Sequence, residues 1–216
     1  MKYYALKLFG RAILTEAKKF ADLCLSGNRW NGNPVLIILD ACLDSSGLNY
    51  FTVVVPKVRE FREKYIKNGR IKVCKDLQKI PRKELLKVFG NNRVWDAMIK
   101  ICMFVSEDKK KSDMQKLKNW SKNADYCNIE NDPIGRIRGV GINTFQYLRM
   151  QSGVNTIMPD KIIARWISKN FSEVNNPQEC IEKGLEIARD MSISGIELCW
   201  AIWIKESHEL SRIEIE

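Results

Sequence analysis

The stretch from Gly139 to Lys161, GVGINTFQYLRMQSGVNTIMPDK, constrains the fold of this chain more than any other. Two glycines flank Val140, and apolar residues at helical spacing follow them. Because glycine tolerates positive φ and lets another backbone come close, GVG predicts a tight turn with Val140 pointing inward. Pro159 holds the preceding residue in an extended conformation, and Asp160 is of a residue type that caps helix N-termini well. The stretch therefore predicts a turn, a helix, an extended link and a further helix.

A short helix is predicted before this turn, because Ile134 and Ile137 are spaced to pack on one helix face. Residues 134–150 are then two helices joined by a hairpin, and the second helix begins at about Ile142. The first N–H groups of that helix have no acceptor inside it, so together with the glycine amides they can bind a phosphate oxygen. Hairpins of this kind grip a DNA backbone without reading its sequence. The candidate phosphate-binding residues are Arg138, Gly139, Val140 and Gly141.

The rest of the chain also shows helical periodicity. The β-branched run before Pro56 is compatible with a strand, but Pro56 and the helical pattern after it favour a helix. We therefore predict an all-α protein with at most a minor strand. The other predicted helices cover residues 11–26, 34–43, 82–89, 92–105, 161–170, 177–191 and 195–207.

Charge and composition narrow the class of protein. The 216 residues include 36 Lys and Arg against 26 Asp and Glu, a net charge of +10. This surplus favours a polyanionic partner but does not separate nucleic acid from an acidic membrane. The single histidine, His208, is expected on a solvated helix and argues against His-based triads. Seven cysteines without a CxxC pair are typical of reduced thiols. With no secretory pattern and no apolar run long enough for a bilayer, we expect a cytoplasmic monomer, nucleoid-associated in a prokaryote.

The GVG turn, the helix after it and the apolar-Pro-Asp sequence that opens the next helix resemble the helix–hairpin–helix (HhH-GPD) DNA glycosylases. This superfamily includes endonuclease III, the adenine mismatch glycosylase and the alkylbase glycosylases. The segments PVLIILDACLDSSG and NNRVWDAMIKICMFV are similar to an early buried helix and a later barrel helix of that family. The resemblance implies an all-α fold of two lobes with a cleft between them. One lobe, residues 31–150, is a helical barrel ending in the hairpin motif at about 133–151, and the other combines 1–30 with 151–216.

The resemblance also implies an activity, the hydrolysis of the N-glycosidic bond of a flipped damaged or modified base in double-stranded DNA, as in base excision repair. Asp160 stands where the family has its catalytic aspartate. A carboxylate there stabilises the positive charge that builds on the deoxyribose and orients the attacking water. Bifunctional members place a lysine two residues after the second glycine, whereas this chain has Asn143, whose amide is not a usable nucleophile. We therefore expect a monofunctional glycosylase.

Other site residues follow from position. Asn143 and Tyr147 lie on the helix that borders the expected base pocket. The loop DSSGLNY is expected to fill the gap left by a flipped base, with Ser46 matching the family position and Leu48 the better wedge on physical grounds. The larger aromatic residues Trp30, Tyr50 and Trp95 either border the cleft or belong to the core.

Cofactor expectations also rest on the resemblance. Many relatives of endonuclease III hold an iron–sulfur cluster on four closely spaced C-terminal cysteines, but only Cys180 and Cys199 lie in that region, so we expect no cluster. The family implies a monovalent cation, Na⁺ or K⁺, at the hairpin carbonyls and no metal held by side chains. The alternative function is a DNA-binding or damage-sensing protein that keeps the fold without catalysis. Alkylated purines, oxidised guanine, uracil, mismatched thymine and modified phage bases all remain open, as do roles in repair and in defence.

Overall fold

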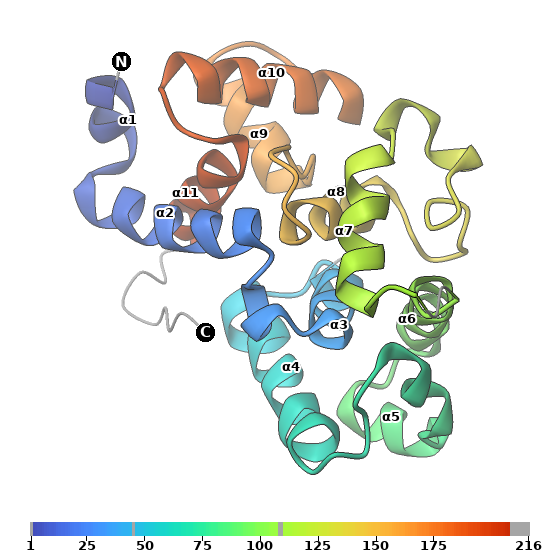
Figure 1. The fold of residues 1–216 in the computed structure, drawn as a ribbon. Helices are drawn as coiled ribbons and strands as arrows, with labels where there is room; N and C mark the ends of the chain where they lie inside the picture. The colour runs from blue at the N-terminus through green and yellow to red at the C-terminus, as the bar shows by residue number, and fades with distance from the viewer. Residues whose placement is uncertain (1, 45, 108–109, 208–216) are drawn as a thin grey trace. The chain divides into compact units, whose positions relative to one another are not determined.

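The computed structural model of the protein describes residues 2–44, 46–107 and 110–207. These residues form helices joined by turns and loops, and none of them lies in a strand (Figure 1). The all-α prediction is confirmed on this part of the chain. His208, expected on a solvated helix, lies outside the described residues.

The chain divides into two compact units. Unit 1 takes the described residues of Met1–Arg29 and Arg149–Glu216, and unit 2 takes those of Trp30–Leu148. Both ends of the sequence therefore contribute to unit 1, while unit 2 is one continuous stretch. Helix α8, Ile142–Gln151, runs along the chain from unit 2 into unit 1.

Unit 1 is organised around its apolar C-terminal helix. The ring of Trp200 stacks on Phe20 with centroids 4.2 Å apart, and the Arg29 guanidinium lies 5.0 Å from the Phe20 ring centroid. All three side chains are buried. This aromatic contact joins the N-terminal and C-terminal segments, and it explains why residues 195–207 are apolar nearly all round. The helices of unit 1 are α1 (Lys2–Phe9), α2 (Arg11–Ser26), α9 (Lys161–Asn170), α10 (Pro177–Asp190) and α11 (Gly195–Ser207).

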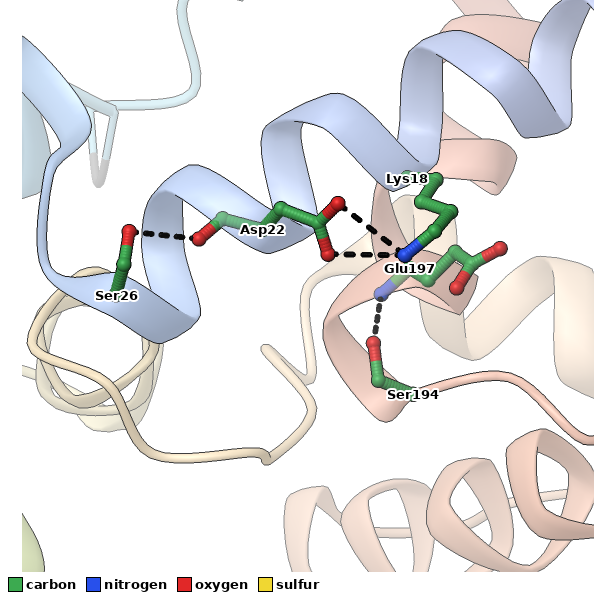
Figure 2. A network of polar contacts seen from close by, with 5 residues as sticks. All are labelled: Lys18, Asp22, Ser26, Ser194 and Glu197. Carbon is green, nitrogen blue, oxygen red and sulfur yellow. Dashed lines mark hydrogen bonds and ion pairs between the residues drawn. The ribbon is translucent and has the colours of Figure 1, made fainter.

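Polar side chains on α2 and at the start of α11 make local hydrogen bonds (Figure 2). The Lys18 ammonium lies 3.1 Å and 3.2 Å from the two carboxylate oxygens of Asp22. The Ser26 hydroxyl donates to the Asp22 carbonyl at 2.8 Å, and the Ser194 hydroxyl accepts from the Glu197 N–H at 3.0 Å. Because Lys18 and Asp22 are exposed, water and salt screen their attraction. The buried aromatic contact therefore dominates this part of unit 1.

Unit 2 is built around α3, whose residues 35–43 are all buried. Pro34 occupies the start of this helix, where its missing N–H leaves no intrahelical bond unmade. The segment with the β-branched run forms helix, as predicted, with π-helical turns on both sides of α4. The helical elements of unit 2 are α3 (Pro34–Asp44), η2 (Tyr50–Val54), α4 (Val55–Phe61), η3 (Arg62–Lys67), η4 (Cys74–Lys79), α5 (Arg82–Val88), α6 (Asn92–Val105), α7 (Asp113–Asn123) and η5 (Tyr126–Asn131), with η1 (Arg29–Gly32) preceding them.

The prediction of a short helix before the GVG turn is wrong. Residues 134–136 and 138 lie in turns instead, with a bend at Ile137. One carboxylate oxygen of Asp132 accepts from the N–H groups of Ile134 at 2.7 Å and Gly135 at 2.9 Å, which draws the backbone into a turn. Gly135 lies so close to the Ile129 carbonyl that a Cβ atom there would overlap with it. Local side-chain bonds and this close approach replace the helix that the isoleucine spacing predicts.

Replacing Gly135 by alanine tests this close approach. The added methyl group must displace the Ile129 backbone, so the free energy of unfolding should fall by about 1–3 kcal/mol. Gly90→Ala is the matched control, because a Cβ at Gly90 meets no atom within 4 Å, and it should change stability by less than about 0.5 kcal/mol. Urea unfolding measures both variants, and equal stabilities would show that the turn adapts without cost.

Candidate functional site

Asp160 caps the N-terminus of α9, as predicted. Its backbone is extended, with φ −74° and ψ 171°. One carboxylate oxygen, Oδ1, accepts from the N–H groups of Ile162 at 2.8 Å and Ile163 at 2.7 Å. The other, Oδ2, accepts from the indole Nε1–H of Trp203 on α11 at 2.7 Å. Three N–H donors from two helices therefore hold this half-buried carboxylate.

The surroundings of Asp160 act on its charge in opposite directions. Burial raises the pKa of the Asp160 carboxyl above its ordinary 3.8, while the bonds from Ile163, Trp203 and Ile162 oppose that rise. Burial also raises the pKa of the nearby Cys180 thiol to about 12, with Asp160 adding to the effect, so this thiol stays neutral. When Asp160 is ionised, it therefore places a negative charge in a poorly solvated site, beside a neutral thiol.

The extended link before Asp160 is fixed to unit 1. Gly153 has a φ of 100°, which favours glycine, and a Cβ there would lie 3.0 Å from the Leu25 carbonyl oxygen. The Asn155 side chain accepts from the N–H of Gly195 at 2.8 Å and so caps α11. The link is therefore held in two places: Gly153 packs closely against α2, and Asn155 caps α11. These contacts fix the position at which Asp160 begins α9.

The GVG turn has the conformation predicted for its first glycine and its valine. Gly139 has a φ of 101°, and Val140 is buried. Gly141 has no positive φ; its carbonyl accepts from the N–H of Phe145 at 3.0 Å, so it is the residue that precedes α8. A Cβ added at Gly141 would meet no atom within 4 Å. The residue that precedes the first N–H groups of α8 therefore has no side chain, and the space that a side chain would occupy is open.

Basic side chains accompany this turn. Arg136 and Arg138 are exposed on the turns before Gly139. A Cβ at Gly139 would lie 3.5 Å from the Arg93 carbonyl oxygen and from the Ala97 side chain, so the N-terminal half of α6 supports the turn. The Arg93 side chain is also exposed. Among the described residues, none of these three arginines has an acidic partner within ion-pair distance.

The predicted pocket residue Tyr147 lies in a buried aromatic network of unit 2. Its ring meets the half-buried Tyr50 ring edge to face, with centroids 6.3 Å apart and an interplanar angle of 82°. The Tyr50 hydroxyl donates to Asp40 Oδ2 at 3.1 Å, and the Trp30 indole N–H donates to the same oxygen at 2.7 Å. Asp40 is fully buried. The structure thus brings Tyr50 and Trp30 together on a carboxylate that the sequence analysis missed, and Tyr147 packs against Tyr50.

The remaining predicted residues separate into surface and core. Asn143 is half-buried, and its side-chain oxygen is shielded from solvent without a hydrogen-bond partner among the described residues. In the expected wedge loop, Ser46 is exposed and Leu48 is half-buried. Trp95 belongs to the core: it is fully buried and its indole N–H donates to the Phe89 carbonyl at 2.7 Å. Trp95 therefore does not border an open site.

Two functional candidates escaped sequence reasoning, for different reasons. Asp40 had a signal, because a single carboxylate inside the apolar run LIILDACL must find donors when the helix is buried. Trp203 had no such signal in the sequence, because a tryptophan in an apolar helix is already accounted for by packing in the core. Its bond to Asp160 joins residues 43 positions apart.

Neither side-chain metal sites nor disulfides occur in the described part of the chain. No group of three or more His, Cys, Asp or Glu side chains there could hold a metal ion. The seven cysteines, all within the described ranges, are free; six are buried and Cys127 is exposed. No described helix is both long and apolar enough to cross a membrane.

Comparison of the chain with protein-family models, with curated proteins and with solved structures finds no match. The functional interpretation therefore rests on the residues and on their geometry.

The raised pKa of Asp160 makes stability depend on pH. A carboxyl whose folded pKa exceeds its ordinary 3.8 adds stability below that value and loses it as the pH rises through the folded pKa. The free energy of unfolding of the wild type minus that of Asp160→Asn should therefore fall as the pH rises from 3.8 towards neutrality. Urea unfolding across this range gives the difference, and an increase with pH would contradict a raised pKa.

Proposed function

We propose that this protein is a monofunctional DNA glycosylase, which hydrolyses the N-glycosidic bond of a flipped damaged or modified base. The observation that carries the proposal is the state of Asp160. Its half-buried carboxylate opens α9 after α8 and the extended link, and three N–H donors hold it. A structural cap needs only the two bonds from its own helix.

The chemistry requires an anion of this kind. As the bond between C1′ and the base breaks, positive charge builds on the deoxyribose, and a carboxylate in a poorly solvated site stabilises it strongly. The same carboxylate can take the proton of the water that attacks C1′. Burial favours the neutral form of Asp160 and raises its pKa, and the N–H donors oppose this rise by favouring the ionised form. With Asn143 in place of a lysine, the product is an abasic site in an intact strand.

The GVG turn and its arginines would hold the DNA backbone. Hydrogen-bond donors at the N-terminus of α8, with no side chain at Gly141 in front of them, suit a phosphate oxygen. The exposed Arg93, Arg136 and Arg138 add positive charge near the turn, in line with the net charge of +10. These contacts carry no base information, so they would position any duplex alike. A monovalent cation at the hairpin carbonyls, implied by the family resemblance, belongs to this proposal.

Contacts to the flipped base are also part of this proposal. Asn143 would offer its side-chain oxygen to a donor on the base, and the half-buried Tyr50 ring would offer apolar contact, with the buried Tyr147 ring packed behind it. Leu48, half-buried on the loop before Tyr50, remains the better wedge than the exposed Ser46, because an apolar side chain replaces base stacking. The partner is double-stranded DNA and the working unit a monomer.

Asp160→Asn tests the catalytic assignment. On a panel of duplexes that each contain one lesion, scored before and after alkali, base release should fall on the order of 100-fold or more. Affinity for the duplex should be equal or higher, because a negative charge near phosphates is removed. Asp22→Asn, which removes an exposed carboxylate from α2, should leave release unchanged. Wild-type release by Asp160→Asn would leave Asp160 a helix cap; duplex binding without release from any lesion would favour the non-catalytic alternative.

Gly141→Asp tests the hairpin. Aspartate caps helices well, so α8 should keep its stability, but the new carboxylate occupies the amides and repels phosphate. Affinity for all duplexes should fall about tenfold or more, since hydrogen bonds to charged groups contribute about 1.5–3 kcal/mol. Gly90→Asp, an equally open position with the same change of charge, is the control and should bind nearly as the wild type does. Equal affinities of the two variants at fixed salt would make the turn purely structural.

A further inference from the structure

We propose that Trp203 is a positioning residue for Asp160: its indole N–H fixes the Oδ2 oxygen and thereby aims the carboxylate at the reacting sugar. This inference rests on the proposed function. It adds a second helix, α11, to the machinery, and nothing in the family resemblance assigns a role to this residue.

The two carboxylate oxygens of Asp160 are anchored from different elements. The amides of Ile162 and Ile163, within α9 itself, bind Oδ1. Trp203 binds Oδ2 from α11 at 2.7 Å. The terminal torsion of an aspartate is broad, so bonds to one oxygen leave the plane of the carboxylate free to turn. The bond to the second oxygen removes that freedom.

The donor is itself held rigidly. The Trp203 ring meets the Trp200 ring edge to face, with centroids 5.1 Å apart and an interplanar angle of 87°. Trp200 in turn stacks on Phe20 of α2. Both of these deeper rings are fully buried, whereas Trp203 is half-buried. The indole N–H is thus preorganised by a row of aromatic contacts and needs no rearrangement when the site becomes charged.

The other groups that face Asp160 cannot replace this donor. On α9, Arg165 favours the charged carboxylate, but its side chain is exposed and lies 3.9 Å from Glu206, so its effect is screened. On α10 and α11, burial raises the pKa of the Cys180 and Cys199 thiols, so they are neutral and supply no positive charge. The two amides of α9 bind Oδ1, and the hydrogen bond to Oδ2 comes from Trp203.

Trp203→Phe removes the N–H and keeps an aromatic ring against Trp200. On a released substrate, kcat should fall about tenfold or more while the affinity for duplex DNA stays the same. Because the lost bond favoured the ionised carboxylate, the acid limb of the kcat–pH profile should move to higher pH. Trp166→Phe is the control, since that tryptophan lies on α9 and stacks on Phe9 instead of bonding to Asp160. It should leave the profile unmoved, and melting curves establish that each variant is folded.

A measurement that needs no activity separates this inference from the proposed function. In ¹⁵N-tryptophan-labelled full-length protein, the Trp203 indole N–H resonance should shift with pH as Asp160 titrates, and the shift should vanish in Asp160→Asn. A resonance that ignores Asp160 overturns the inference. A responding resonance with an unmoved kcat–pH profile in Trp203→Phe also overturns it and leaves the glycosylase standing. A responding resonance without base release from any duplex overturns the proposed function, and the positioning role with it.

Discussion

The stacking of Phe20 on Trp200 is the contact on which the candidate catalytic centre depends. It joins α2, near the start of the chain, to α11, near its end. Once α11 is fixed, Trp203 faces Asp160 and Asn155 caps the helix that carries both tryptophans. Burial of the two large rings contributes roughly several kcal/mol to the stability of the fold. The exposed ion pair of Lys18 and Asp22 on α2 contributes far less. This contact therefore contributes both to the stability of unit 1 and to the geometry of Asp160.

Two helix N-termini in this chain treat their unpaired amides in opposite ways. At α9, Asp160 satisfies two amides with its own carboxylate. At α8, Gly141 has no side chain and leaves the amides open. The N-terminus of α9 is capped by a carboxylate of the chain itself, whereas the N-terminus of α8 is suited to an anion from a ligand. The contrast follows from the residue that precedes each helix, aspartate in one case and glycine in the other.

Sequence patterns predicted most of the fold because most helices here follow from local chemistry. Apolar periodicity, Pro34 at a helix start and Asp160 at an N-cap are short-range signals, and each gave an element that the structure contains. The failures came from interactions that periodicity does not encode. The turn at Asp132 won over the isoleucine spacing because side-chain bonds and a close backbone approach compete with helix formation. Trp203 could not be assigned because its partner is far away in the sequence.

The left-handed turn at Trp30 has a consequence for how this protein can change. Trp30 and Asn31 have φ values of 54° and 55°, a conformation that costs a residue other than glycine about 1–3 kcal/mol. The indole of Trp30 is tied to the buried Asp40, which also accepts from Tyr50. A glycine at position 30 would relieve the backbone but leave a cavity and a buried carboxylate short of a donor. The strained turn, the acid and the tyrosine are thus a linked set, and substitutions that persist over evolutionary time should appear in them together.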